Sequence, residues 1–180
     1  MTRLLRHSTP LVLVLAALCS LAQEPNWKQF KSRGGWKISY PADWQISSCR
    51  SCKDPTSAGV FVDFSPPTNA EGFVMVEQLA SRPSNISADA WLRDVSTRAN
   101  VNPQIQGQKL TVSNLPARKV RYRTVSGEEM ESVYVVSGSD TFALDFNGEL
   151  DSKRPGVPLE KLNGYAIYLE MITTFRVELH

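Results

Sequence analysis

Histidine and cysteine are scarce in this sequence of 180 residues, which has two histidines and three cysteines. Charge of one sign is also lacking: twenty Lys and Arg residues against eighteen Asp and Glu residues give a formal net charge of +2. Proteins that bind nucleic acid concentrate positive charge to hold phosphates, so we expect no nucleic-acid partner. The sequence has no repeats or low-complexity tracts, and its 42% hydrophobic and 21% charged residues are typical of one globular domain.

Long hydrophobic runs are missing as well. The uncharged apolar run at residues 11–19 is far shorter than the roughly 20 residues of a transmembrane helix, and no later stretch approaches that length. Two arginines precede this run and small residues follow it up to Ala22, an order typical of a secretory signal peptide. We therefore predict a signal peptide over residues 1–22, cleaved after Ala22, and an exported protein that is periplasmic or secreted.

Cys19 leaves an alternative to this cleavage, because a cysteine directly after an apolar run can carry a lipid anchor. Lipoprotein signals have a small residue before that cysteine, whereas Leu18 stands there, so cleavage after Ala22 is favoured. Removal of residues 1–22 would leave a formally neutral chain. Its cysteines would then be Cys49 and Cys52, and its histidine would be His180.

Periodic patterns predict the secondary structure of the remaining chain. Alternating or continuous apolar residues bounded by turn residues predict strands at 36–40, 44–46, 59–64, 72–79, 106–112, 117–125, 130–137 and 140–146. The first of these strands ends at Pro41. The turns between the later strands are short, and such turns join antiparallel strands.

Two helices complete the expected fold. Ser87 is a good N-cap, so the first helix is predicted over 87–99, with its apolar residues Ala88, Trp91, Leu92 and Val95 facing the core. The second is predicted over 159–175, with its apolar side formed by Leu162, Ala166, Leu169 and Thr173 and widened by Tyr165, Met171 and Ile172. We predict a single α+β domain over 36–177 after a lead at 23–35, with one antiparallel sheet of six to eight strands flanked by helices.

Residues 36–44, Trp-Lys-Ile-Ser-Tyr-Pro-Ala-Asp-Trp, resemble the aromatic-x-x-x-Tyr-Pro-x-x-Trp opening of PsbP-like domains and of related exported bacterial proteins with the Mog1/PsbP fold. The similarity extends over residues 30–177. Further residues that carry it are Leu115, Pro116, Ala117, Tyr122, Tyr134, Gly138, Phe142, Phe146 and Phe175. The resemblance implies an α-β-α sandwich and a non-enzymatic accessory role. Tyr40, Pro41 and Trp44 are also explained by strand termination and apolar closure of a sheet end.

Cys49 and Cys52 form a Cys-x-x-Cys sequence. In an exported chain we interpret this pair as a local disulfide that closes the loop between the strands at 44–46 and 59–64. A zinc site would need further ligands that the chain lacks, and haem attachment would need a histidine where Lys53 stands. A redox-active dithiol is the remaining alternative.

Three basic residues alternate along the strand at 117–125 and share one of its faces: Lys119, Arg121 and Arg123. The next strand begins with three glutamates: Glu128, Glu129 and Glu131. Opposite charges on neighbouring strands favour cross-strand ion pairs. We therefore predict solvated ion pairing, with binding of an anion or of an acidic partner as the alternative.

Four oxygen-bearing side chains occur at every second residue near the end of the strand at 140–146: Asp145, Asn147, Glu149 and Asp151. Such side chains are calcium ligands, but their spacing is not that of an EF-hand. We favour turn formation and keep a metal ion as the alternative.

The residues offer little for catalysis. His180 alone cannot supply the base of a nucleophilic triad, and no glycine-rich phosphate loop occurs, so we expect neither an enzyme nor a bound cofactor. The predicted function is that of an exported, non-enzymatic accessory or binding protein with a protein partner in the cell envelope. An exposed aromatic patch near Trp27, Phe30 and Trp36 would carry that interaction.

A second hypothesis makes the chain a carrier of a small ligand or metal ion. In that case a cleft would bring Tyr40 and Trp44 together with the acidic residues at 145–151.

Overall fold

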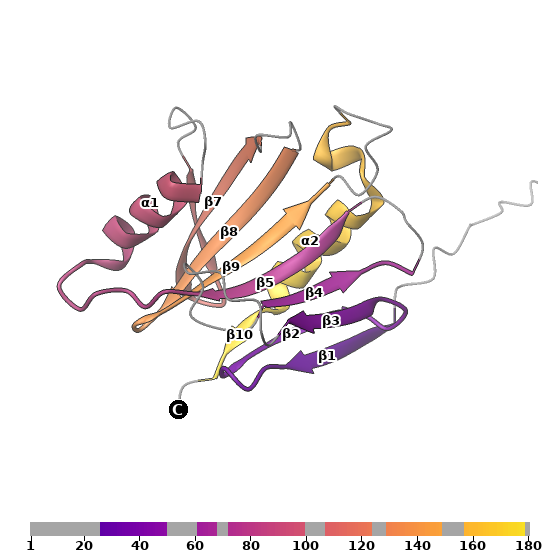
Figure 1. Cartoon of the computed structure of the whole chain (residues 1–180), viewed down its shortest axis with the longest axis horizontal. Coiled ribbons are helices and arrows are strands. Elements are labelled where there is room, and N and C mark those ends of the chain that lie inside the picture. Colours follow the sequence, from indigo (N-terminus) through magenta and orange to yellow (C-terminus); the bar gives the residue numbers. More distant parts are fainter. Residues whose placement is uncertain are drawn as a thin grey trace, which may run out of the picture.

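The computed structural model describes residues 26–49, 61–67, 72–99, 107–123, 129–148 and 157–178. These residues form two antiparallel sheets (Figure 1). The small sheet has the order β1-β2-β10 and consists of β1 (Trp27–Lys31), β2 (Trp36–Pro41) and β10 (Arg176–Val177). The large sheet has the order β3-β4-β5-β9-β8-β7-β6 and consists of β3 (Gln45–Cys49), β4 (Phe61–Ser65), β5 (Phe73–Leu79), β9 (Asp140–Asn147), β8 (Glu129–Ser137), β7 (Leu115–Arg123) and β6 (Gln108–Val112).

The prediction of a single sheet is wrong, although each predicted strand overlaps an observed one. After β2 the chain turns, with the Trp44 N–H donating to the Pro41 carbonyl at 3.0 Å, and β3 then joins a different sheet. The two edges of β2 pair instead with β1 and β10, neither of which was predicted. A pairing between β2 and β10 depends on how the intervening chain folds, so local periodicity cannot reveal it.

The two helices lie on opposite faces of the large sheet. Successive residues of a strand point to opposite faces, and on one face Val76, Leu144 and Val133 pack in a core with α2 (Asn163–Thr174) and the small sheet. On the other face, Tyr134 and Ala143 pack with α1 (Ala88–Ala99). Figure 1 shows α1 beside β7 and β8, with α2 behind β5 and β9.

Helix α1 agrees with its prediction. The Ser87 hydroxyl accepts a hydrogen bond from the Ala90 N–H at 3.2 Å, as expected of an N-cap. Trp91 and Leu92 are buried against the sheet. The indole N–H of Trp91 also donates to Thr141 Oγ1 of β9 at 2.8 Å, which fixes the helix at one end of this face.

The second predicted helix is divided in two. A single 3₁₀ turn, η1 (Leu159–Lys161), ends at Leu162, whose extended backbone (φ −87°, ψ 131°) precedes α2. The predicted apolar side of α2 is partly wrong, since Ala166, Leu169 and Thr173 are exposed. The buried side chains of this segment are Leu162, Tyr165, Tyr168, Met171, Ile172 and Phe175. Because apolar residues occur all round this helix, the sequence pattern does not define which side is buried.

This assignment of the buried side gives a matched pair of variants. Met171 is 0% exposed and Leu169 is 41% exposed, one on each side of the same helix. Met171→Ala should lower the free energy of unfolding by about 2–5 kcal/mol, the cost of a cavity in the core. Leu169→Ala should change it by less than about 0.5 kcal/mol. Urea denaturation of the two variants measures the difference, and equal losses would contradict the assignment.

Candidate functional site

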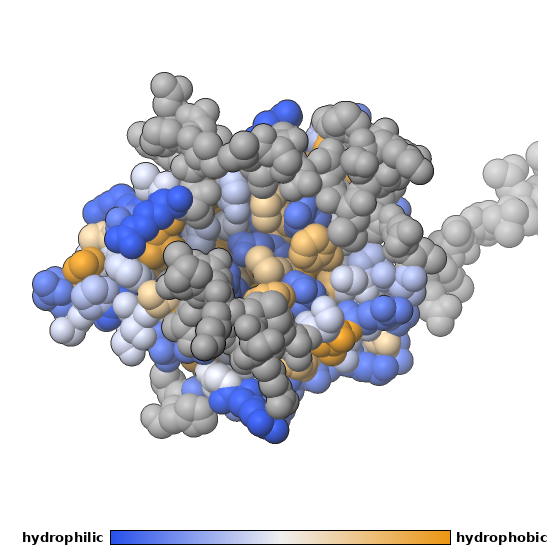
Figure 2. Space-filling model, viewed as in Figure 1, coloured by the Kyte–Doolittle hydropathy of each residue, from blue (hydrophilic) through white to orange (hydrophobic). Residues whose placement is uncertain are grey.

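A cleft lies between α1 and the large sheet, and we call it the α1 cleft. It has a volume of about 390 Å³. Its lining comes from β5, the residue after it, α1, β7, β8 and β9: Met75, Glu77, Leu79, Ala80, Trp91, Val95, Arg98, Tyr122, Met130, Tyr134, Ala143 and Asp145. Most of these side chains are apolar or aromatic, and Figure 2 shows apolar side chains among polar ones on this face. The cleft is therefore an apolar space with a few charged groups.

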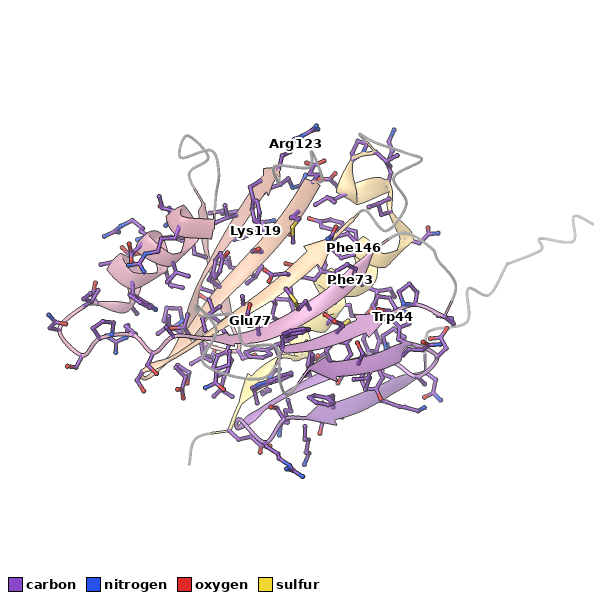
Figure 3. The ribbon with its side chains drawn as sticks, in the orientation of Figure 1. Trp44, Phe73, Glu77, Lys119, Arg123 and Phe146 are labelled. Carbon is purple, nitrogen blue, oxygen red and sulfur yellow. The ribbon has the colours of Figure 1, made fainter. Side chains whose placement is uncertain are left out.

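Strand register explains which side chains form the floor of the cleft. Asp145 of β9 lies opposite Met75 of β5 and opposite Ser132 of β8. Two residues along β9, Ala143 lies opposite Glu77, which Figure 3 labels on β5. Helix α1 packs over β7 and β8. The side chains of β5 and β9 on this face are therefore not covered by α1, and they line the cleft.

Asp145 is the most unusual residue of this floor. It is 7% exposed, and its Oδ1 atom has no hydrogen-bond partner among the described residues. Burial raises the pKa of Asp145 to about 7; the hydrogen bond from Ser132 opposes this effect, and the negative charge of Glu77 adds to it. A carboxyl group with this pKa changes charge near neutral pH. A perturbed pKa at a residue that lines a cleft is typical of functional sites.

Two tyrosines lie near Asp145. Burial and the charge of Asp145 raise the pKa of both Tyr122 and Tyr134, so both phenols stay protonated at neutral pH. The hydroxyls of Tyr122 and Ser132 are hydrogen-bonded at 3.4 Å. The floor therefore combines a buried carboxyl group with neutral hydroxyls and aromatic ring faces.

The helix side of the cleft is apolar inside and basic at its rim. Trp91 and Val95 line the inner part. Arg98, the basic lining residue, lies with its guanidinium carbon 5.8 Å from the centre of the Trp91 ring and pairs with Asp94 at 2.5 Å. Asp94 balances the charge of Arg98, and the lining also holds the acidic side chains of Glu77 and Asp145.

The basic row occupies the other face of the sheet. Lys119, Arg121 and Arg123 share that face, as predicted, and the first and last are labelled in Figure 3. Lys119 Nζ lies 3.7 Å from Glu131 Oε2, and Arg121 Nη2 lies 3.1 Å from it. The predicted cross-strand ion pairing is confirmed for Lys119 and Arg121, while Glu128 lies outside the described residues.

The predicted solvation of these ion pairs is only partly correct, because Glu131 is 1% exposed whereas the side chains of Lys119 and Arg121 are 32% and 33% exposed. Arg121 also contacts Glu160 of η1 at 2.5 Å and the Tyr165 hydroxyl of α2 at 3.0 Å. The Tyr165 hydroxyl in turn donates to Glu131 at 2.9 Å. This network joins η1 and α2 to the sheet. Removing Arg121 would leave the buried Glu131 carboxylate without its nearest cation, which is unfavourable, so a structural role accounts for Arg121.

The predicted acidic loop is only partly described. Asp145 and Asn147 belong to β9 rather than to a turn, so turn formation does not explain Asp145. Glu149 and Asp151 lie outside the described residues. Within the described ranges, no group of three or more His, Cys, Asp or Glu residues is placed to hold a metal ion.

Several other predicted features also fall outside the described residues. The signal peptide at 1–22, Cys19, Cys52 and His180 belong to this group. The backbone of Cys49 ends β3, paired with Phe61, and the disulfide between Cys49 and Cys52 stays a prediction. None of the helices in the described ranges is long and apolar enough to cross a membrane.

The predicted aromatic surface is part of the core. Trp36 is 1% exposed, and its ring centre lies 5.3 Å from that of Phe30, which also contacts Phe64 at 5.8 Å. Trp27 and Phe30 are half-buried and pack against this core. An exposed patch at these residues is therefore the wrong prediction.

Tyr40 and Trp44 do not line the α1 cleft with Asp145, while Glu149 and Asp151 lie outside the described residues. Tyr40 and Trp44 are each 9% exposed and belong to the core on the α2 face, in agreement with the structural role that the sequence indicates. Trp44 lies far from α1 in Figure 3. Asp145 lies on the α1 face of the sheet, so the prediction that it shares a cleft with Tyr40 and Trp44 is wrong. The α1 cleft could not be predicted from the sequence, because its lining comes from separate segments.

The comparisons with known proteins identify the fold. No protein-family model matches the chain, and no curated protein matches it. Among solved structures, the chain is similar to cyanobacterial PsbP (CyanoP) from Synechocystis sp. PCC 6803, with a TM-score of 0.60 and 13% identity over 88% of this chain and 96% of that one. The chain therefore has a PsbP-like fold, which confirms the resemblance seen in the sequence.

A protein from Bacteroides thetaiotaomicron is also similar, with a TM-score of 0.55 and 13% identity. The match covers 85% of this chain and 49% of that protein.

The raised pKa of Asp145 predicts how stability depends on pH. The folded state binds a proton at Asp145 more tightly than the unfolded chain, whose Asp pKa is about 3.9. The stability gained by protonation is therefore fully present below pH of about 4 and is lost as the pH rises through about 7. This term should lower the free energy of unfolding by on the order of 2–3 kcal/mol between pH 5 and pH 8.

Asp145→Asn should remove that decrease, and urea denaturation at the two pH values measures it. The matched control is Asp43→Asn, because Asp43 is exposed in the turn after β2; this variant should keep the decrease. An equal pH dependence in Asp145→Asn and the unaltered protein would show that Asp145 does not titrate in this range.

Proposed function

We propose that this chain is an exported, non-enzymatic binding protein and that the α1 cleft holds its ligand. The observation that carries the proposal is the cleft itself, whose volume of about 390 Å³ lies within the range of about 300–1,000 Å³ that is typical of small-molecule sites. Such sites are lined mostly by apolar and aromatic side chains with a few placed polar groups. The α1 cleft has this composition, with Asp145 and Glu77 as its acidic groups.

The accessory part of the proposal is supported by the fold. A PsbP-like fold fits a non-enzymatic accessory role, in which the protein and its ligand act on another component of the cell envelope. The aromatic surface first expected to contact such a partner is packed in the core at Trp36. The proposal therefore places binding in the α1 cleft, which corresponds to the carrier hypothesis rather than to the aromatic-patch hypothesis.

The lining also supports a role in binding rather than catalysis. It includes no serine, cysteine, lysine or histidine among the described residues, and these are the common nucleophiles and bases of hydrolases. A single buried carboxyl group beside neutral tyrosines is suited to holding a charged or hydrogen-bonding group of a ligand. Export is proposed from residues 1–22 and would bring the cleft into contact with molecules outside the cytoplasm.

A dye titration tests whether the cleft binds apolar molecules. Nile red is neutral and fluoresces more strongly in apolar surroundings, so the purified chain should increase its fluorescence with a single saturable transition. Ala80 is an exposed lining residue, and Ala80→Trp should fill the mouth of the cleft. This variant should weaken dye binding by about tenfold or more, because the dye loses its buried apolar contact area.

The matched control is Ala166→Trp, at an exposed alanine of α2 on the other face of the sheet. It adds the same side chain and should leave dye binding unchanged. Equal affinities for the Ala80→Trp variant and the unaltered chain would overturn the assignment of the ligand to the α1 cleft.

A further inference from the structure

Asp145 gives the α1 cleft a chemical preference. Its side chain is more than nine-tenths buried, lines the cleft, and has an oxygen atom, Oδ1, without a hydrogen-bond partner among the described residues. A buried acceptor without a partner costs free energy, and the cost is larger for a charged group. A ligand that places a cation beside the Asp145 carboxylate would offset the cost of this buried charge, whereas a purely apolar ligand would not.

The groups around Asp145 favour a positively charged donor. Glu77 of β5 adds negative charge to the same cleft, whereas Asp63 of β4 lies on this face of the sheet but outside the lining. Tyr122 of β7 and Tyr134 of β8 are neutral. Arg98 of α1 is the basic residue of the described lining, and its charge is balanced by Asp94.

The apolar part of the lining indicates the chemical character of the rest of the ligand. Trp91, Tyr122 and Tyr134 offer aromatic rings, which attract cations over their faces, and Met75 and Leu79 offer apolar surface. A divalent metal ion would need several oxygen ligands, and the described residues do not place three acidic groups together. A single carboxylate among aromatic rings is better suited to one ammonium group.

We infer that the ligand of the α1 cleft is a small apolar amine, whose ammonium group pairs with Asp145 and whose apolar body lies between α1 and β5. This inference rests on the proposed function, because it names the class of ligand that the cleft would hold. The ammonium group would donate to the Asp145 carboxylate, and a charge-assisted hydrogen bond of this kind is stronger than one between neutral groups. The aromatic rings would contact the remaining methylene groups and the body of the ligand.

Three probe molecules with one common body test the inference on the unaltered protein. They are 2-phenylethylamine, 2-phenylethanol and 3-phenylpropionate, which carry an ammonium, a hydroxyl and a carboxylate group. Isothermal titration calorimetry at pH 8 should show the amine binding about ten- to a hundredfold more tightly than the alcohol, as expected of a charge-assisted hydrogen bond. The carboxylate should bind most weakly, because Asp145 and Glu77 repel it.

Two variants assign the preference to one residue. Asp145→Asn should reduce affinity for the amine to about that for the alcohol and leave alcohol binding nearly unchanged. The matched control is Asp63→Asn. Asp63 lies on the same face and also has an oxygen atom, Oδ1, without a hydrogen-bond partner among the described residues, but it does not line the cleft. This variant should bind the amine as the unaltered protein does.

The pH dependence of amine binding gives a second readout. An alkylammonium group stays charged below pH of about 10, as lysine does, so protonation of Asp145 is the event expected to weaken binding. With a pKa of about 7 for Asp145, affinity for the amine should fall by about tenfold from pH 8 to pH 6. Affinity for 2-phenylethanol should change little over the same range.

The outcomes separate the two proposals. If Nile red binds in the cleft but the amine shows no preference over the alcohol, or if Asp145→Asn keeps that preference, the amine inference is wrong and the proposed function stands. If Ala80→Trp leaves Nile red binding unchanged, the proposed function fails and the amine inference fails with it. Tight amine binding that depends on Asp145 and is lost in Ala80→Trp supports both.

Discussion

The position of β9 in the large sheet is the constraint on which the rest of this account depends. It pairs with β5 on one side and with β8 on the other, so the direction of each of its side chains is fixed by register. Phe142, Leu144 and Phe146 therefore point into the core with α2. The residues between them, including Asp145, point to the α1 face. Because both edges of β9 are paired, the strand cannot rotate to move the Asp145 carboxyl group into solvent.

Each face of the large sheet carries a buried acid, and the two acids differ in whether a basic side chain is paired with them. On the α2 face Glu131 is held by Arg121 and Tyr165, and this network connects the sheet to η1 and α2. On the α1 face Asp145 has a hydrogen bond from Ser132 but no cation that pairs with it among the described residues. A buried charge without a counter-charge is unfavourable. The cleft beside it provides the space in which a ligand can supply that charge.

The sequence predicted what depends on short-range periodicity. The faces of Lys119, Arg121 and Val120 on β7 follow from the alternation of a strand, and Ser87 was recognised as the cap of α1 from residue type alone. The buried side of α2 could not be predicted, since Leu169 and Met171 are both apolar and only the packed sheet distinguishes them. Asp145 looked like part of a polar loop because its place inside the sheet comes from pairing with β5, which is distant in the sequence. The α1 cleft has the same origin and was missed for the same reason.

The central claim is that Asp145 is a buried acid whose charge a ligand completes, and the titration of this single carboxyl group tests it most directly. Carbon-13 NMR of the protein labelled at aspartate carboxyl carbons, with the Asp145→Asn variant to assign the signal, measures its midpoint. The account predicts a midpoint at pH of about 7 in the free protein and a lower midpoint with 2-phenylethylamine but not with 2-phenylethanol. A midpoint near the ordinary aspartate value of about 3.9, unchanged by the amine, would contradict it.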